Sequence, residues 1–555
     1  MHRPWVSSLP LLCLLTSQLP SQLPQRAEPV VVYTGSFITL DSLNPRAEAM
    51  AVRQGRIVAI GNRRHVDSVA GPAARHAVLR GVALPGFADA HVHPAMLGEM
   101  LMALDLRAKS KAQILASVRQ AAANAPSGRW IRGMGWDQSF WTPPVYPTAA
   151  ELDAASAGHP VLLERIDGHA VWANTAAMKL AGITSATADP PGGTLTRDAA
   201  RNPTGIFIDD AIDLIRRGLP AATQDDAERR LRAAMDRYAR WGLTSIHDAG
   251  ASLLDVSAYH ALAAKGPLPV RAYVMASTDD SSLAATLARG VEIGLARGTF
   301  TLRTVKVVDD GALGSRGARL SAPYADDATQ RGFELAGNGR LDRIIQQATA
   351  RGFQVAVHAI GDASSHDVLA AFERAGPGAR SSRFRLEHAS MLRDEDVKTL
   401  VRLGVIASMQ PVFVGEYSRF AQARLGKERL PWVLRSRDVI AAGAVYAAGT
   451  DFPASDTGDP IMTLYAMVTR RGFDGRPESG WLADQRVSVD VALRAMTIGP
   501  AYAAFEEREG GILRDGRRAD VTVLSADPYR VPPAQLRTLR VLRTIVGGRT
   551  TYEAK

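Results

Sequence analysis

The sequence predicts an α/β protein: a (β/α)8 TIM barrel with a discontinuous β-sandwich domain built from both termini. Eight strand-like segments alternate with helical segments, which is the pattern of parallel βα units. Polar residues directly follow several of these strands, as expected at the mouth of such a barrel. Short hairpin-like strands at both ends of the chain predict the second domain. With 555 residues, the chain is long enough for both.

The predicted β-sandwich domain combines residues 28–85 with residues 505–555. Small hairpin units need a partner sheet, so the two ends of the chain are expected to pair with each other. Gln54-Gly55 is a typical hairpin turn in the first part, and Gly547-Gly548 is one in the second. The strands expected here are residues 30–33, 37–40, 49–52, 56–61, 520–524 and 541–546.

The predicted barrel occupies residues 86–504. Its strands are expected at 84–93, 243–248, 269–276, 302–309, 353–358, 384–389, 404–410 and 444–451. Its helices are expected at 222–241, 280–297, 339–351, 364–376, 392–402, 432–442 and 458–471. The interval between the first two strands is too long for one βα unit. It therefore predicts an insertion, placed at about residues 126–210.

The composition is that of a globular protein, with 46% hydrophobic and 22% charged residues. This excludes a disordered, collagen-like or coiled-coil chain. The net charge of +10 comes from arginines interleaved with acidic residues, not from a basic stripe, so we expect no nucleic-acid partner. Cys13 is the single cysteine, which excludes disulfides within the chain and thiolate metal sites.

Residues 1–27 are predicted to be an export signal. His2 and Arg3 precede an apolar stretch, Trp5 to Leu15, that is too short to span a bilayer as a stable helix. We therefore expect an exported protein, periplasmic or secreted. The alternative is a disordered extension on a cytoplasmic protein. No later stretch stays apolar over about 18 residues, so no stable membrane span is predicted.

The first barrel strand leads into a pair of histidines, His91 and His93. Residues i and i+2 of a strand face the same side, so both imidazoles can point into one cavity. The fifth, sixth and eighth strands end in His358, His388 and Asp451. Any one histidine alone could equally be a hydrogen-bonded structural residue. Together, four histidines and a carboxylate at strand ends indicate a site for zinc or a similar divalent ion.

Lys306 lies within the fourth predicted strand, where a buried ammonium is costly unless it is paired or deprotonated. One interpretation is a structural ion pair with Asp309 or Asp310. The other is a carbamylated lysine whose new carboxylate bridges two cations. We favour the carbamylated lysine.

Several long motifs carry a resemblance to a known family. Residues 86–93, Gly-Phe-Ala-Asp-Ala-His-Val-His, are similar to the first-strand signature of the amidohydrolase superfamily. Further motifs narrow the resemblance to the amidohydrolase-3 group, which includes YtcJ-like proteins and N-substituted formamide deformylases. These motifs are residues 306–316, 358–362, 386–389 and 449–453 in the barrel and residues 135–138, 167–174 and 203–206 in the insertion.

The resemblance implies a metal-dependent hydrolase that binds one or two divalent ions, with zinc the expected metal. Carried over position by position, the ligands are His91, His93, Lys306, His358, His388 and Asp451. Asp451 is the expected general base and then acid. His169, in the insertion, is a candidate for contacting substrate or stabilising an oxyanion. The equal alternative is that it only holds the insertion loop.

The expected reaction is hydrolysis of a linear C–N bond of the amide type, in an N-acyl or N-formyl amine, by metal-activated water. A cyclic amidase and a hydrolytic deaminase are the alternatives among enzymes. An alternative of another class is a metal-binding barrel that has lost catalysis, against which the retention of all six candidate ligands argues. The expected partner is a small-molecule substrate, and a homo-oligomer is left open.

Overall fold

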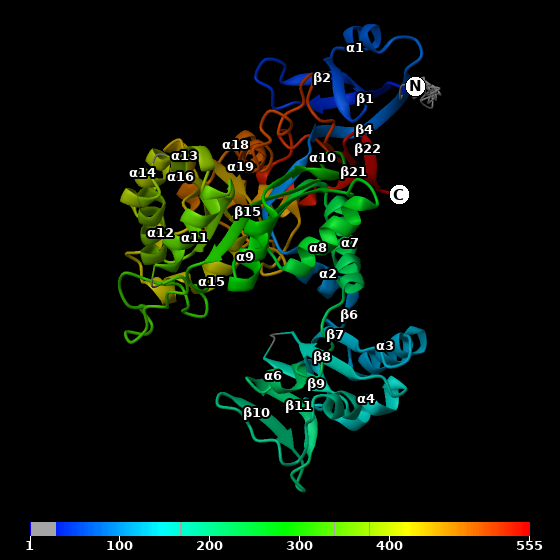
Figure 1. The fold of residues 1–555 in the computed structure, drawn as a ribbon, viewed down its shortest axis with the longest axis vertical. Coiled ribbons are helices and arrows are strands. Elements are labelled where there is room, and N and C mark those ends of the chain that lie inside the picture. The colour runs from blue at the N-terminus through cyan, green and yellow to red at the C-terminus, as the bar shows by residue number, and fades with distance from the viewer. Residues whose placement is uncertain (2–28, 167–168, 338, 377) are drawn as a thin grey trace.

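The computed structural model describes residues 1, 29–166, 169–337, 339–376 and 378–555. Apart from Met1, the export signal predicted for residues 1–27 lies outside these ranges. Figure 1 shows three parts in a row: a β domain, a central barrel and an insertion domain at the opposite end of the molecule. Among the described residues, no helix combines the length and the apolar character that crossing a membrane would need.

The central barrel is a sheet of eight parallel strands in the order β19-β18-β17-β16-β15-β13-β12-β5, with the short β14 (Glu292–Gly294) paired to β15. Asp451 N donates to His91 O at 2.7 Å across the gap between the two edge strands, so the barrel is nearly closed. The predicted barrel is confirmed. The strands are β5 (Phe87–Val92), β12 (Leu243–Ala251), β13 (Arg271–Ser277), β15 (Phe300–Val308), β16 (Gln354–Ala359), β17 (Arg385–His388), β18 (Ile406–Met409) and β19 (Tyr446–Ala448).

Helices surround this sheet and pack on its outward-facing apolar residues. The predicted helix 280–297 is interrupted, because α9 (Asp280–Arg289) ends at Gly290, whose φ of 84° no longer fits a helix. Several helices were not predicted, among them the long helices α8 (Leu253–Ala264) and α15 (Val414–Leu425). The remaining helices around the barrel are α2 (Pro94–Met102), α7 (Gln224–Arg240), α10 (Leu295–Gly298), α11 (Arg340–Ala350), α12 (Asp362–Arg374), α13 (Gly378–Ser382), α14 (Asp394–Leu403), α16 (Ser436–Ala441), α17 (Pro460–Thr469), α18 (Val489–Ala495) and α19 (Ile498–Ala503).

The β domain joins the two ends of the chain in one seven-stranded sheet, in the order β22-β21-β20-β4-β1-β2-β3. Strand β4 pairs in parallel with β1 and antiparallel with β20, which makes the domain discontinuous in sequence. Side chains from both ends, such as Phe37 and Val523, share a buried core. The elements are β1 (Val31–Ile38), β2 (Arg46–Arg53), β3 (Arg56–Gly61), α1 (Arg63–Ala70), β4 (Arg75–Pro85), β20 (Val521–Leu524), β21 (Val541–Val546) and β22 (Arg549–Glu553).

The insertion domain is built on a six-stranded sheet in the order β10-β11-β9-β8-β7-β6. In Figure 1 it lies beyond α2 and α7, on the side of the barrel away from the β domain. Its sheet begins at Leu104, well before the predicted start at about residue 126. The first strand, β6, could not be recognised in the sequence because it is only two residues long and shows no hydrophobic periodicity. The elements are β6 (Leu104–Asp105), α3 (Lys111–Asn124), β7 (Ile131–Trp136), α4 (Ala149–Ser156), β8 (Val161–Arg165), β9 (Ala170–Ala173), α5 (Thr175–Leu180), β10 (Gly193–Arg197), β11 (Pro203–Asp209) and α6 (Ile212–Arg216).

Candidate metal centre

The end of the first barrel strand is pinned to the end of the last one by Asp89. Its carboxylate accepts a hydrogen bond from the backbone amide of His91 at 3.0 Å. It also accepts hydrogen bonds from the backbone amide and the hydroxyl of Thr450, at 3.0 and 2.7 Å. Burial raises the pKa of Asp89 to about 7. Because Asp451 follows Thr450, these bonds bring Asp451 beside His91 and His93.

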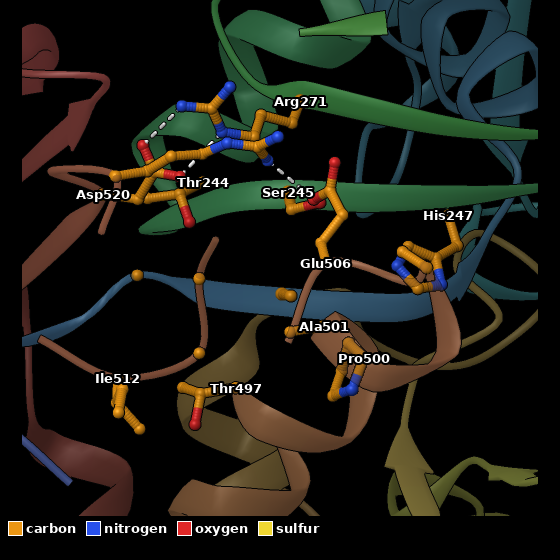
Figure 2. Close-up of a pocket in the computed structure, with 16 residues that line it drawn as sticks. Thr244, Ser245, His247, Arg271, Thr497, Pro500, Ala501, Glu506, Ile512 and Asp520 are labelled. Carbon is orange, nitrogen blue, oxygen red and sulfur yellow. Dashed lines mark hydrogen bonds and ion pairs between the residues drawn. The ribbon is translucent and has the colours of Figure 1, made fainter. Parts of the chain in front are cut away.

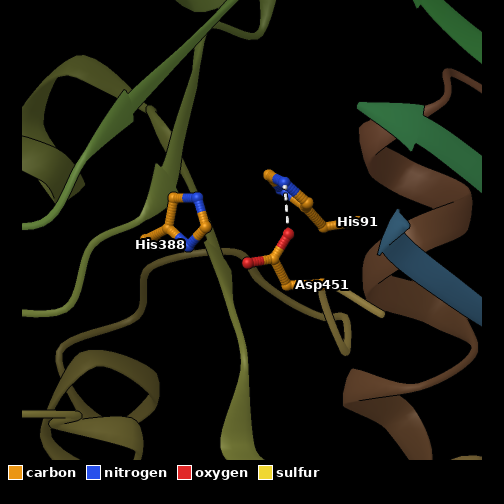
Figure 3. A group of neighbouring side chains, drawn as sticks. All are labelled: His91, His388 and Asp451. Carbon is orange, nitrogen blue, oxygen red and sulfur yellow. Dashed lines mark ion pairs between the residues drawn. The ribbon is translucent and has the colours of Figure 1, made fainter. Parts of the chain in front are cut away.

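Three predicted ligands from different strands meet at this end of the barrel. His91, His388 and Asp451 each offer an atom, and these atoms all lie within 4.8 Å of one another (Figure 3). His93 Nε2 lies 2.9 Å from Asp451 Oδ1, and His91 Nε2 lies 3.4 Å from the same oxygen. The ring of His358 is 4.2 Å from that of His388, centroid to centroid. The structure thus brings the four predicted histidines and the aspartate together.

Two of these residues have a left-handed backbone that non-glycine residues seldom adopt: φ is 71° at His388 and 64° at Asp451. In a regular strand, successive side chains point to opposite faces. Glu387 points into the barrel, so regular alternation would turn the next residue, His388, outward. The left-handed backbone at His388 lets its side chain face the interior as well. Such strain is typical of functional sites.

Three buried imidazole nitrogens at this centre lack a hydrogen-bond partner among the described residues: His91 Nε2, His358 Nε2 and His388 Nδ1. Native proteins rarely leave buried polar atoms unsatisfied. Burial lowers the pKa of all three histidines, that of His358 to about 3, so the rings are neutral. Neutral imidazoles with free lone pairs beside a carboxylate are a donor set that fits a divalent ion such as zinc.

Lys306 also lies inside the barrel, on β15. Its neighbours Val305 and Val307 belong to the hydrophobic core between the barrel and the surrounding helices. The side chain of Lys306 is buried on the other face of the strand, with its Nζ 3.5 Å from Ala249 O. Among the described residues it forms no ion pair with Asp309 or Asp310. Burial lowers the pKa of Lys306, which favours the neutral amine that can react with carbon dioxide. Its carbamylation stays a prediction.

His169 is placed elsewhere. It precedes β9 in the insertion domain, its side chain is 74% exposed, and its Nδ1 lies 2.7 Å from Asp209 Oδ1. It does not belong to the cluster inside the barrel. The three nearby tryptophans, Trp136, Trp141 and Trp172, pack on one another in the buried core of the insertion.

Sequence reasoning missed the role of Glu387. Its Oε2 lies 2.6 Å from His91 Nδ1, so it faces the ring nitrogen that points away from the cluster. A signal was available, because Arg385 and Glu387 are charged residues at alternate positions of a buried strand. Such charges are costly unless they are paired inside the protein.

A cavity of about 30 Å³ lies at the opposite end of the barrel, between the starts of its strands and the β domain (Figure 2). Its lining includes Thr244, Glu506 and the ion pair of Arg271 with Asp520. This volume is large enough for ordered water and too small for a substrate-sized ligand. The cluster at the other end is the candidate site because it gathers buried imidazoles and a carboxylate.

Comparison with known proteins agrees with this geometry. The family model described as "Amidohydrolase family" matches residues 81–552. The chain belongs to the amidohydrolase family. This amidohydrolase is 33% identical to YtcJ of Bacillus subtilis (strain 168), over 94% of this chain and 99% of that protein. It is 32% identical to the protein LONG AFTER FAR-RED 3 of Arabidopsis thaliana, over 99% of this chain and 96% of that protein.

The amidohydrolase is also 28% identical to the N-substituted formamide deformylase of Arthrobacter pascens, over 94% of this chain and 98% of that protein. Among solved structures, an uncharacterized metal-dependent hydrolase of Pyrococcus horikoshii covers 91% of this chain and 99% of its own, with 27% identity and a TM-score of 0.76. The predicted family is confirmed, and the protein is a hydrolase of the amidohydrolase superfamily.

Proposed function

We propose that this amidohydrolase cleaves a linear amide-type C–N bond, in an N-acyl or N-formyl amine, with water activated at the metal centre. The observation that carries the proposal is the convergence of neutral imidazoles and Asp451 on one buried point. The similarity to an N-substituted formamide deformylase along nearly the whole chain supports the bond type.

The proposed ligands are the six residues carried over from the family, and zinc is the proposed metal. When bound, a divalent ion supplies an acidified water molecule and a Lewis acid for the substrate carbonyl. The proposed role of Asp451 is to take a proton from water and return it to the leaving nitrogen, and the closeness of its Oδ1 to His93 and His91 supports this role. A carbamylated Lys306 would hold a second ion. The complete set of ligands favours this function over a barrel without catalysis.

The proposal is tested by metal analysis and a substrate screen. We expect one or two divalent ions per chain, and release of free amine from members of panels of N-formyl, N-acetyl and longer N-acyl amines. Chelation should abolish turnover, and zinc should restore it. Asp451→Asn should lower turnover by about 10²–10⁴-fold, the usual contribution of a general base. Full turnover after chelation, or in Asp451→Asn, would contradict the proposal.

A further inference from the structure

A row of fully buried polar side chains crosses the barrel interior beneath the metal centre. Arg385 and Glu387, both 0% exposed, are paired through Arg385 Nε and Glu387 Oε1 at 2.6 Å. The other oxygen of Glu387 faces His91 Nδ1 at 2.6 Å. On the far side, Arg385 Nη1 lies 3.0 Å from Nδ1 of the buried His247. The row therefore runs from His247 through Arg385 and Glu387 to a candidate metal ligand.

The chemistry of Arg385 gives every hydrogen bond in this row one direction. A guanidinium only donates, so His247 Nδ1 and Glu387 Oε1 both accept from it. A carboxylate only accepts, so the short contact at Glu387 Oε2 requires a proton on His91 Nδ1. A neutral imidazole carries one proton, which leaves His91 Nε2 with a free lone pair. That nitrogen is one of the three at the metal centre that have no hydrogen-bond partner among the described residues.

Arg385 is itself held rigidly. Its Nη2 donates to Ala90 O at 2.7 Å and to Ser408 Oγ at 3.1 Å. It thereby contacts β5 one residue before His91 and also reaches β18. A purely structural role would end there, with the arginine tying four strands together.

We propose that Arg385 and Glu387 are positioning residues that hold His91 in the tautomer protonated on Nδ1 and thereby set the metal affinity of the centre. The inference rests on the proposed function in that it takes the cluster to bind a divalent ion. Some carboxylates orient a histidine ligand by accepting a hydrogen bond from the ring nitrogen that does not bind the metal. Replacing such a carboxylate typically lowers metal affinity by about 10–100-fold.

The direction of the row is tested with Glu387→Gln. The glutamine amide has one accepting and one donating end, and Arg385 requires the accepting end. The amide NH2 group then faces His91 Nδ1 and drives the imidazole proton to Nε2. We expect zinc affinity, measured by competition with a chromophoric chelator, to fall by about 10–100-fold. In Arg385→Met/Glu387→Gln the amide is free to turn its oxygen toward His91, so zinc affinity should recover most of that loss.

Two further variants separate positioning from stability. Arg385→Met/Glu387→Leu leaves no unpaired buried charge, so it is expected to fold even where Glu387→Gln does not. It offers no acceptor to His91 and should show the 10–100-fold loss. His247→Gln keeps an acceptor for Arg385 on the far side of the row and should bind zinc within about twofold of the wild type. Thermal unfolding of each metal-free variant reports stability separately.

The outcomes distinguish this inference from the proposed function. The positioning role is supported if zinc affinity falls in Glu387→Gln and in Arg385→Met/Glu387→Leu, which offer His91 no acceptor, and returns in Arg385→Met/Glu387→Gln. Wild-type affinity in both Glu387→Gln and Arg385→Met/Glu387→Leu overturns it and leaves the proposed function standing. A wild-type protein that binds no zinc overturns both.

Discussion

Gly449 follows β19 and stands directly against the metal centre, which makes Gly449→Ala a sensitive test of the site. A Cβ at this position would lie 2.7 Å from His91 N, 2.9 Å from His91 Cβ and 3.0 Å from Asp89 Oδ1. Ordinary contact begins at 3.4 Å, so the gap to His91 N must open by 0.7 Å. The nearest atom belongs to the backbone, so no side-chain rotation can relieve the clash.

The expected cost has two parts. Overpacking a close-packed site typically costs about 1–3 kcal/mol of stability. Displacement of His91 also misplaces a candidate ligand, and loss of ligand orientation typically costs about 10–100-fold in metal affinity. We therefore expect zinc affinity to fall by about tenfold or more. The φ of Gly449 is not left-handed, so backbone strain adds nothing to this effect.

The assays are zinc competition with a chromophoric chelator and thermal unfolding of the metal-free protein. Gly510→Ala is the matched control, because a Cβ there meets no atom within 4 Å and its φ is not left-handed either. It should keep wild-type affinity and stability. Wild-type zinc affinity in Gly449→Ala would refute the packing of β19 against His91 on which the site rests.

Three other predictions follow, the first two from the structure and the third from the sequence. Lys306→Ala should lose a second metal ion and most turnover, in part restored by acetate. Full metal content with near-normal turnover would exclude a bridging lysine. Arg271→Met leaves Asp520, whose side chain is only 14% exposed, without its ion-pair partner and should cost about 3 kcal/mol in urea unfolding. By contrast, Arg107→Met, at the exposed pair with Asp105, should cost at most about 1 kcal/mol. The mature N-terminus should lie between residues 17 and 30; native protein sequenced from Met1 would argue against export.

The barrel and most of its metal centre could be predicted because both leave local patterns in the sequence. Strands buried on both faces read as apolar runs, and the ends of parallel strands meet at one edge of a barrel. His91, His93, His358, His388 and Asp451 could therefore be grouped although they are spread over most of the chain. Lys306 could likewise be singled out, because an ammonium within an apolar strand is costly unless it is paired or deprotonated.

Only the tertiary structure decided which partner each of these groups has. Glu387 and His91 lie 296 residues apart, and their contact depends on strand register and on the curvature of the barrel, which no local pattern encodes. The left-handed backbone at His388 likewise breaks the alternation that sequence reasoning assumes. Sequence alone thus determined the fold and the kinds of ligand, because these follow from local period. Packing across the barrel decided which nitrogen of His91 carries the proton. The buried guanidinium of Arg385 can only donate hydrogen bonds, so Glu387 accepts from it and from His91 Nδ1, and His91 Nε2 keeps a free lone pair.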